Sequence, residues 1–185
     1  MMKAVNGSKK TSTITFRLDD DTIHRLRDLS KVQEVSTNTL VNQALKKFID
    51  WDVYLPRSGF VILSKPVLKK FFDGMDEKSV VEIASTIGKE GIEDIALFMR
   101  GKVDLTSFIS WYEILMINSS VQISHLVDNG FHNMVLKHDL GRKWSLYQKT
   151  ILELIFKELF HQKIELQCDK NTVRIMFADD GIATL

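Results

Sequence analysis

The stretch STITFRLDDDTIHRL, residues 12–26, changes its hydrophobic period near its midpoint. Up to Leu18, polar and apolar residues alternate, which predicts a short β-strand with two unlike faces. The apolar face is Ile14, Phe16 and Leu18, and the polar face is Thr13, Thr15 and Arg17. From Asp19 onward the apolar residues recur about every third position, and three consecutive aspartates supply a helix cap and an acidic first turn. The sequence therefore predicts a strand followed at once by a helix that ends near residue 35.

A second helix is predicted from about Thr37 to Trp51, with Ser36 as its N-cap. Its broad apolar face is made of Leu40, Val41, Ala44, Leu45, Phe48 and Ile49. One strand and two short helices, about 40 residues in all, cannot bury a core of their own. A lone strand also leaves its backbone N–H and C=O groups unpaired. We therefore expect two copies of the chain to pair their strands antiparallel and to share one apolar core.

The paired strands would present Thr13, Thr15 and Arg17 twice on one surface. Such a ribbon fits the major groove of DNA, where Arg binds guanine bidentately and Thr contacts a base edge or the thymine methyl group. Residues 1–18 carry basic side chains, Lys9 and Lys10 among them, and no acidic one. A basic arm suits contact with a phosphate backbone, and a merely solubilising tail is the alternative.

The segments TITFRLDDDTIHRL and VSTNTLVNQAL, taken in this order, resemble the ribbon-helix-helix DNA-binding family, which includes the MetJ and Arc repressors. The resemblance covers about 40 residues and implies a dimeric β-α-α fold that binds double-stranded DNA. It implies that Thr13, Thr15 and Arg17 contact bases. Family members commonly have Gly two residues before the Ser that starts the second helix, whereas this chain has Glu34.

The same resemblance implies that the start of the second helix, Ser36, Thr37 and Asn38, holds a phosphate. A helix N-terminus is an anion site on physical grounds as well, because its first N–H groups lack intrahelical acceptors. We expect Lys9 and Lys10 of the arm to contact phosphates too. Two alternatives remain open: an antitoxin-like module that binds another protein, and a structural oligomer that does not read DNA sequence.

The organisation predicted for the whole chain has four parts: a flexible basic arm (1–11), the ribbon-helix-helix domain (12–54), a linker, LPRSG (55–59), and an α+β domain (60–185). In the last part we expect helices at about 65–73, 77–88, 92–99 and 105–118. A hairpin, a long helix and a second hairpin follow, over about 121–139, 142–161 and 163–177. These elements predict an antiparallel sheet with helices on one side, for ligand sensing or higher oligomerisation.

Two histidines invite a sharper interpretation of the first hairpin. With Asn129-Gly130 as a two-residue turn, His125 and His132 become diagonal neighbours on an apolar face. The favoured interpretation is that both are structural histidines, with their hydrogen bonds satisfied, at the edge of the apolar face. A metal site or a pH sensor is the alternative. Cys168 shares its predicted strand face with apolar residues, so a buried structural thiol is expected.

The bulk composition bounds the function classes. Net charge is +1, 44% of residues are hydrophobic and there is one Cys, which fits a globular protein of a reducing cytoplasm. We expect no signal peptide, no membrane span and no cofactor. Catalytic and phosphate-loop motifs are absent from the sequence, so we expect a non-enzyme. The expected partners are DNA, further copies of the chain and an unidentified small-molecule effector.

Overall fold

A computed structural model describes residues 11–101 and 104–178, and its contacts divide the chain into two compact units. The N-terminal unit ends at Asp50 and the C-terminal unit begins at Trp51. Each is described by itself. The division falls a few residues before the boundary expected from the sequence, because Trp51 and Tyr54 belong to the core of the C-terminal unit.

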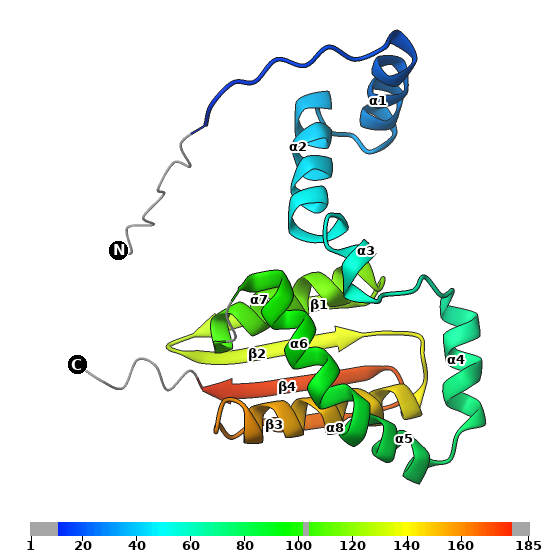
Figure 1. Cartoon of the computed structure of the whole chain (residues 1–185), viewed down its shortest axis with the longest axis vertical. Coiled ribbons are helices and arrows are strands. Elements are labelled where there is room, and N and C mark those ends of the chain that lie inside the picture. The colour runs from blue at the N-terminus through cyan, green and yellow to red at the C-terminus, as the bar shows by residue number, and fades with distance from the viewer. Residues whose placement is uncertain (1–10, 102–103, 179–185) are drawn as a thin grey trace. The chain divides into compact units, whose positions relative to one another are not determined.

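The N-terminal unit contains two helices, α1 (Asp20–Val32) and α2 (Thr37–Lys47), in the places predicted (Figure 1). The strand expected before α1 is not formed in the single chain, where residues 11–19 have no regular secondary structure. An extended segment becomes a strand only when a neighbour accepts its backbone hydrogen bonds, and one copy of the chain offers none here.

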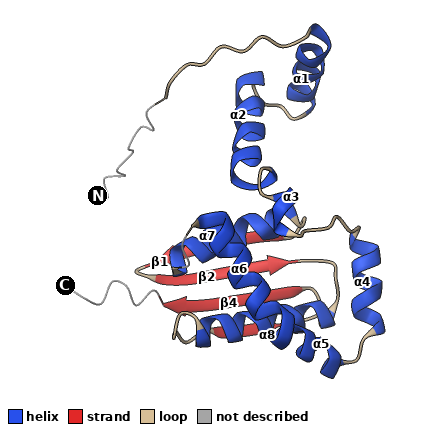
Figure 2. Cartoon of the chain, in the orientation of Figure 1, coloured by secondary structure: helices blue, strands red, loops and turns tan. Residues whose placement is uncertain are grey.

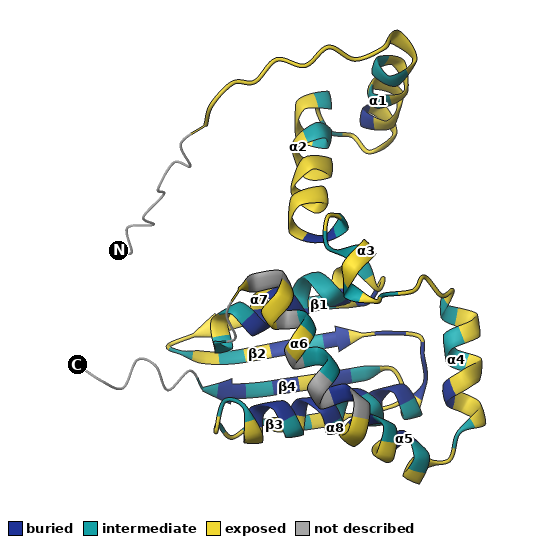
Figure 3. Ribbon diagram, viewed as in Figure 1, coloured by how far each residue is buried: buried dark blue, intermediate teal, exposed yellow. Residues whose placement is uncertain are grey.

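Burial in the N-terminal unit is slight (Figure 3). Among residues 11–50 only Ser30 is buried, and the apolar side chains of the helices are at best half-buried. The single chain therefore holds two helices without an apolar core between them.

The C-terminal unit opens with short helical pieces. After α2 the chain continues through a π-helical turn, η1 (Phe48–Asp52), and then forms α3 (Leu55–Ser58). The stretch expected to be a linker, 55–59, is thus mostly helical, and it ends at Gly59 with a left-handed φ of 72°. Trp51 stacks on Phe60 with ring centroids 5.3 Å apart, which ties the two ends of this turn together.

Four helical segments follow, and their places match the prediction. They are α4 (Lys65–Gly74), α5 (Glu77–Ile83) extended by the π-helical turn η2 (Ala84–Gly88), α6 (Lys89–Arg100) and α7 (Leu105–Asn118). Asp76 and Asp104 cap α5 and α7 by accepting backbone N–H groups. Gly88 lies where η2 packs against the helix α8 (Arg142–Glu158), and a Cβ at this position would lie 2.6 Å from the Ile151 side chain.

The sheet is antiparallel and has the strand order β1-β2-β4-β3 (Figure 2). Its strands are β1 (Gln122–Asp128), β2 (Phe131–Lys137), β3 (Glu165–Cys168) and β4 (Thr172–Ala178), and α8 (Arg142–Glu158) joins the two hairpins. The expected α+β fold, helices and then hairpin-helix-hairpin, is confirmed for this unit. Asn129 and Gly130 have φ values of 47° and 79°, as the predicted type I′ turn requires.

Helices α7 and α8 cover the same face of the sheet (Figures 1 and 3). The core lies between these helices and the sheet. Its largest buried side chains include Phe108, Trp111, Tyr112, Met134, Ile151, Phe156 and Ile175. The buried Tyr112 hydroxyl donates to Gln148 Oε1 over 2.9 Å, so the polar groups at this point of the core are paired. The start of α8 is fixed by Lys143, whose ammonium donates to the carbonyls of Asp73 and Met75 at the end of α4.

The prediction that Cys168 is a buried structural thiol is wrong, because Cys168 is exposed. It shares the inner face of the sheet with Leu166 and Val173, but β3 is an edge strand and Cys168 is its last residue before the turn. A position at a sheet corner leaves the side chain uncovered even when its face is the correct one. Within the described parts of the chain, no helix has the length and hydropathy to cross a lipid bilayer.

Candidate nucleic-acid interface

The three residues expected to contact bases, Thr13, Thr15 and Arg17, are all exposed in the extended segment before α1. In the single chain these three side chains do not form one face of a strand, because residues 11–19 have no regular secondary structure. The segment ends at Asp19, whose carboxylate accepts the backbone N–H and the hydroxyl of Thr22, each over 2.8 Å. Both hydrogen bonds hold the pKa of Asp19 below its ordinary value, and the bond from the Thr22 backbone N–H has the larger effect. The helix cap therefore fixes where the extended segment stops.

The turn between the helices begins with Glu34, the residue at which the chain departs from the family that it resembles. Glu34 has a φ of 54°, in the left-handed region that favours Gly. Its N–H donates to the Lys31 carbonyl and the Val35 N–H donates to the Ser30 carbonyl, as in a Schellman motif. The backbone thus adopts the geometry that a Gly would take here without strain.

The start of α2 is built from the predicted phosphate-contacting residues. Ser36 is the N-cap, and its hydroxyl oxygen accepts the Thr39 N–H over 3.0 Å. Asn38 accepts the Asn42 side-chain amide at its own carbonyl oxygen and remains exposed. Ser36 therefore acts first as a cap, and the anion-binding capacity of this end lies in the N–H groups of the first turn.

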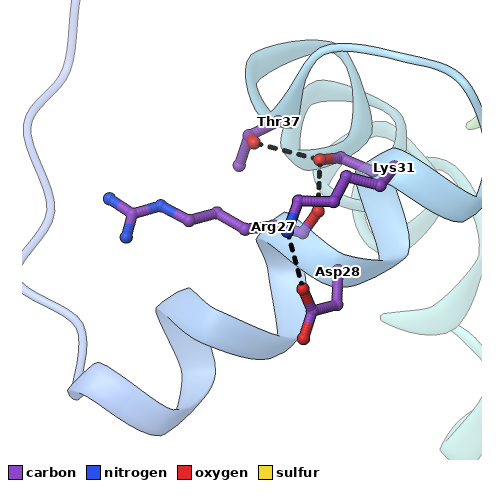
Figure 4. Close-up of polar contacts among 5 residues, drawn as sticks. Arg27, Asp28, Lys31 and Thr37 are labelled. Atoms are coloured by element: carbon purple, nitrogen blue, oxygen red, sulfur yellow. Dashed lines mark hydrogen bonds and ion pairs between the residues drawn. The ribbon is translucent and has the colours of Figure 1, made fainter.

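One buried polar contact locks the two helices together at this point. The Ser30 hydroxyl donates to the Arg27 carbonyl over 2.8 Å and lies 3.2 Å from the Thr37 hydroxyl oxygen. Figure 4 shows Thr37 pointing toward α1 and a separate ion pair between Lys31 and Asp28 on the exposed side. Thr37, expected to contact phosphate, is thus engaged inside the unit by its hydroxyl.

Arg27 is a cation that sequence reasoning missed. Its side chain is exposed, and in Figure 4 it extends away from the Ser30–Thr37 contact. It lies on α1 one turn before Ser30, whose hydroxyl meets Thr37 at the start of α2. Nothing in the linear pattern distinguished it from the other basic residues of α1, because its relevance depends on the contact between the helices.

The apolar faces of the N-terminal unit are open to solvent. Phe16 is 59% exposed and Val32 is 80% exposed. The other large apolar side chains in this exposed set are Ile14, Leu18, Leu29, Leu45, Phe48 and Ile49. Lys9 and Lys10, expected to contact phosphates, lie outside the described residues.

The two candidate metal-binding histidines lie in the C-terminal unit, remote in sequence from these residues. His125 faces Met134 and Val127 faces His132 across the hairpin, in the predicted register. His125 Nε2 lies 2.9 Å from His132 Nδ1, so these two ring nitrogens form a hydrogen bond with each other. They are therefore not both directed at a metal ion. Within the described residues no three His, Cys, Asp or Glu side chains are arranged to hold a metal ion.

Comparison with known proteins adds no assignment. No protein-family model matches the chain, and no curated protein matches it. The resemblance of residues 12–52 to ribbon-helix-helix proteins therefore stays a prediction that rests on the residues themselves.

Proposed function

We propose that this chain is a homodimeric, sequence-specific DNA-binding regulator of transcription that reads the major groove with a two-stranded ribbon. In the dimer, residues 12–18 of two copies pair antiparallel and present Thr13, Thr15 and Arg17 to the bases. The C-terminal unit serves either to sense a small molecule or to join dimers into larger assemblies.

The observation that carries the proposal is the missing core of the N-terminal unit. Ser30 is its only buried residue between residues 11 and 50, while apolar side chains on the extended segment and both helices stay exposed. Large exposed apolar surfaces mark interfaces, and a second copy would bury this one while completing the strand pairing.

The polar chemistry of the same unit suits DNA. Arg17 can bind guanine bidentately, and the threonines can reach base edges from a ribbon. The first turn of α2 offers N–H groups to a phosphate, and Arg27 lies close by in the chain as a further cation. Phosphate contacts position the unit on the duplex, whereas the ribbon supplies the sequence preference.

The test is selection from a random duplex pool, followed by titration of the selected duplex and of a scrambled one. Arg17→Ala should lower the discrimination between the two by about 1–3 kcal/mol. Lys10→Ala should weaken binding to both duplexes alike and flatten the salt dependence. The matched control is Arg174→Ala, which removes an exposed Arg from the C-terminal unit and should change neither property.

The outcomes separate the alternatives. If Arg17→Ala leaves both affinity and preference intact, the ribbon does not read DNA. An antitoxin-like protein would instead be isolated with a second small protein on its apolar face. A purely structural oligomer would show no salt-dependent affinity for DNA.

A further inference from the structure

We propose that the basic hollow, a cavity of about 810 Å³ in the C-terminal unit, binds a small molecule that carries phosphate groups. Its wall is formed by α4, the first residue of α5, the first turns of α8 and the turn between β3 and β4. The inference rests on the proposed function only for the sensing role of this unit, and its test needs no DNA.

The size of the basic hollow suits a small molecule. Pockets that hold cofactors and other small ligands have volumes of about 300–1,000 Å³, and the volume of this one, about 810 Å³, lies in that range. A DNA duplex is too wide to enter such a cavity and would touch only its rim. We therefore expect a compact ligand rather than a nucleic-acid backbone.

Cations outnumber carboxylates on the wall of the basic hollow. The carboxylates are those of Asp73, Glu77 and Asp169. The cations are those of Lys69, Arg142, Lys143, Lys149 and Lys170. Glu153, which lies 3.6 Å from Lys149 on α8, adds one more carboxylate, and cations outnumber carboxylates even when it is counted. A concave surface with this charge attracts anions.

The carboxylates of the wall already have partners. Asp73 Oδ2 accepts from Lys69 Nζ over 2.8 Å. Asp169 Oδ1 accepts a backbone N–H of its own turn over 2.8 Å. Glu77 Oε1 lies 4.0 Å from Arg142 Nε, and the two side chains are 63% and 80% exposed. Such a long, exposed ion pair contributes little, so Arg142 is available to a ligand.

Lys143 is the cation that the fold holds in place at the wall. Its ammonium donates to the backbone carbonyls of Asp73 and Met75, and one of its three N–H groups is left for a ligand. The positive charge acts on the wall: the Lys69 hydrogen bond first, and then the charges of Lys69 and Lys143, hold the pKa of Asp73 below its ordinary value. A phosphate oxygen that accepts from Lys143 forms a charge-assisted hydrogen bond, which is stronger than a neutral one.

The start of α8 adds backbone donors to these cations. Its N-cap is Gly141, which makes no side-chain hydrogen bond to the first turn. Arg142 and Lys143 follow, at a helix end where the dipole disfavours cations and favours an anion. A bound phosphate would therefore offset the repulsion between these two cations and the helix dipole.

The first experiment titrates the full chain with inorganic pyrophosphate and with ADP by calorimetry, at an ionic strength fixed with sodium chloride. We expect one saturable site per chain. Lys170→Gln should raise the Kd about tenfold, because it removes a hydrogen bond to a charged group. Lys170 is exposed in its turn, so this change disturbs no packing. The matched control is Lys163→Gln, which removes an exposed lysine near the opposite end of β3 and should bind as the wild type does.

The two compounds separate two sources of the phosphate. Tighter binding of ADP indicates an organic phosphate, and tighter binding of pyrophosphate indicates an inorganic one. Either result supports the proposal when Lys170→Gln weakens the binding.

The second experiment uses Cys168 as a local reporter, because it is the only cysteine of the chain and lies on the wall of the basic hollow. Its Sγ lies 3.8 Å from the Ser145 carbonyl oxygen on α8. Saturating pyrophosphate should slow the alkylation of Cys168 by iodoacetamide about threefold in the wild type, since a bound anion covers the thiol and disfavours the thiolate. Sodium chloride at the same ionic strength should not.

The proposal is overturned if neither compound binds, if Lys163→Gln weakens binding as much as Lys170→Gln, or if saturation leaves the alkylation rate unchanged. Protection of Cys168 by a short duplex of random sequence, as strong as that by pyrophosphate, would also overturn it, because the hollow would then contact a DNA backbone. None of these outcomes depends on the Arg17→Ala test, so failure of this proposal and failure of the proposed function are distinguishable.

Discussion

Replacing Phe16 by Ala tests the shared core of the proposed dimer. Phe16 lies on the apolar side of the extended segment and is 59% exposed in the single chain. If two copies pair through this segment, the ring becomes buried in both. Truncation then lowers the free energy of dimerisation, whereas in a monomer it would remove almost nothing.

The magnitude follows from the exposed area. A phenylalanine offers roughly 200 Å² of surface, so the 59% exposed in Phe16 leaves about 120 Å² for a partner to bury. At about 25 cal/mol per Å² this burial is worth about 3 kcal/mol per copy. Alanine keeps about a third of it, so Phe16→Ala removes about 4 kcal/mol per dimer. Such a loss raises the dimer dissociation constant about 1,000-fold.

The assay is sedimentation velocity over a dilution series of the full chain. Thr15→Ala is the matched control, because it alters the polar side of the same segment and should leave the dissociation constant nearly unchanged. The reasoning is refuted if Phe16→Ala and Thr15→Ala dimerise equally well, or if the wild type is monomeric at every concentration that the assay reaches.

Two further predictions concern single residues. Burial lowers the pKa of His138 to about 4, so the unfolded chain takes up this proton before the folded one as the pH falls. The contribution of neutral His138 to the free energy of unfolding is fully present above pH 6.5. It falls by up to about 3 kcal/mol between pH 6.5 and 4. His138→Asn should remove this decline from urea-unfolding free energies measured against pH, and an unchanged slope would contradict the assignment. Glu34→Gly should stabilise the turn after α1 by about 0.5–1 kcal/mol, because Gly adopts the left-handed φ without strain. Glu34→Ala, which removes the charge but keeps the strain, should not stabilise it in the same thermal melts.

The fold of the C-terminal unit could be predicted because its local signals agree with its tertiary structure. The Asn129-Gly130 turn sets the register of the first hairpin, and Asp76 and Asp104 mark helix starts in the sequence. The predicted helices and strands therefore differ from the observed ones mainly at their ends. Where a helix continues as a π-helical turn, as in η1 and η2, the hydrophobic period alone gives no warning.

Features that depend on a neighbour could not be derived from the sequence. Cys168 has the correct face but lies at the corner of an edge strand, and the strand order β1-β2-β4-β3 is not encoded in the alternation. The same limit applies to the histidines: the sequence places His125 and His132 diagonally, but Glu113, whose Oε1 lies 2.6 Å from His125 Nδ1, comes from another element. In the N-terminal unit, the sequence does not show that Arg27 lies near the start of α2, because this depends on the contact of Ser30 with Thr37.

The two units also differ in what holds them together, and this difference bears on the proposed function. The C-terminal unit buries a continuous core within one chain, whereas the N-terminal unit exposes the residues that should form its core. A segment that folds fully only on pairing has a stability that depends on protomer concentration. Formation of the ribbon, dimerisation and DNA binding would then be linked steps, and dilution alone would release the DNA. A C-terminal unit that joins chains raises the local concentration of the N-terminal segments and so favours the ribbon. If the proposed function holds, the C-terminal unit would influence DNA binding without touching the DNA.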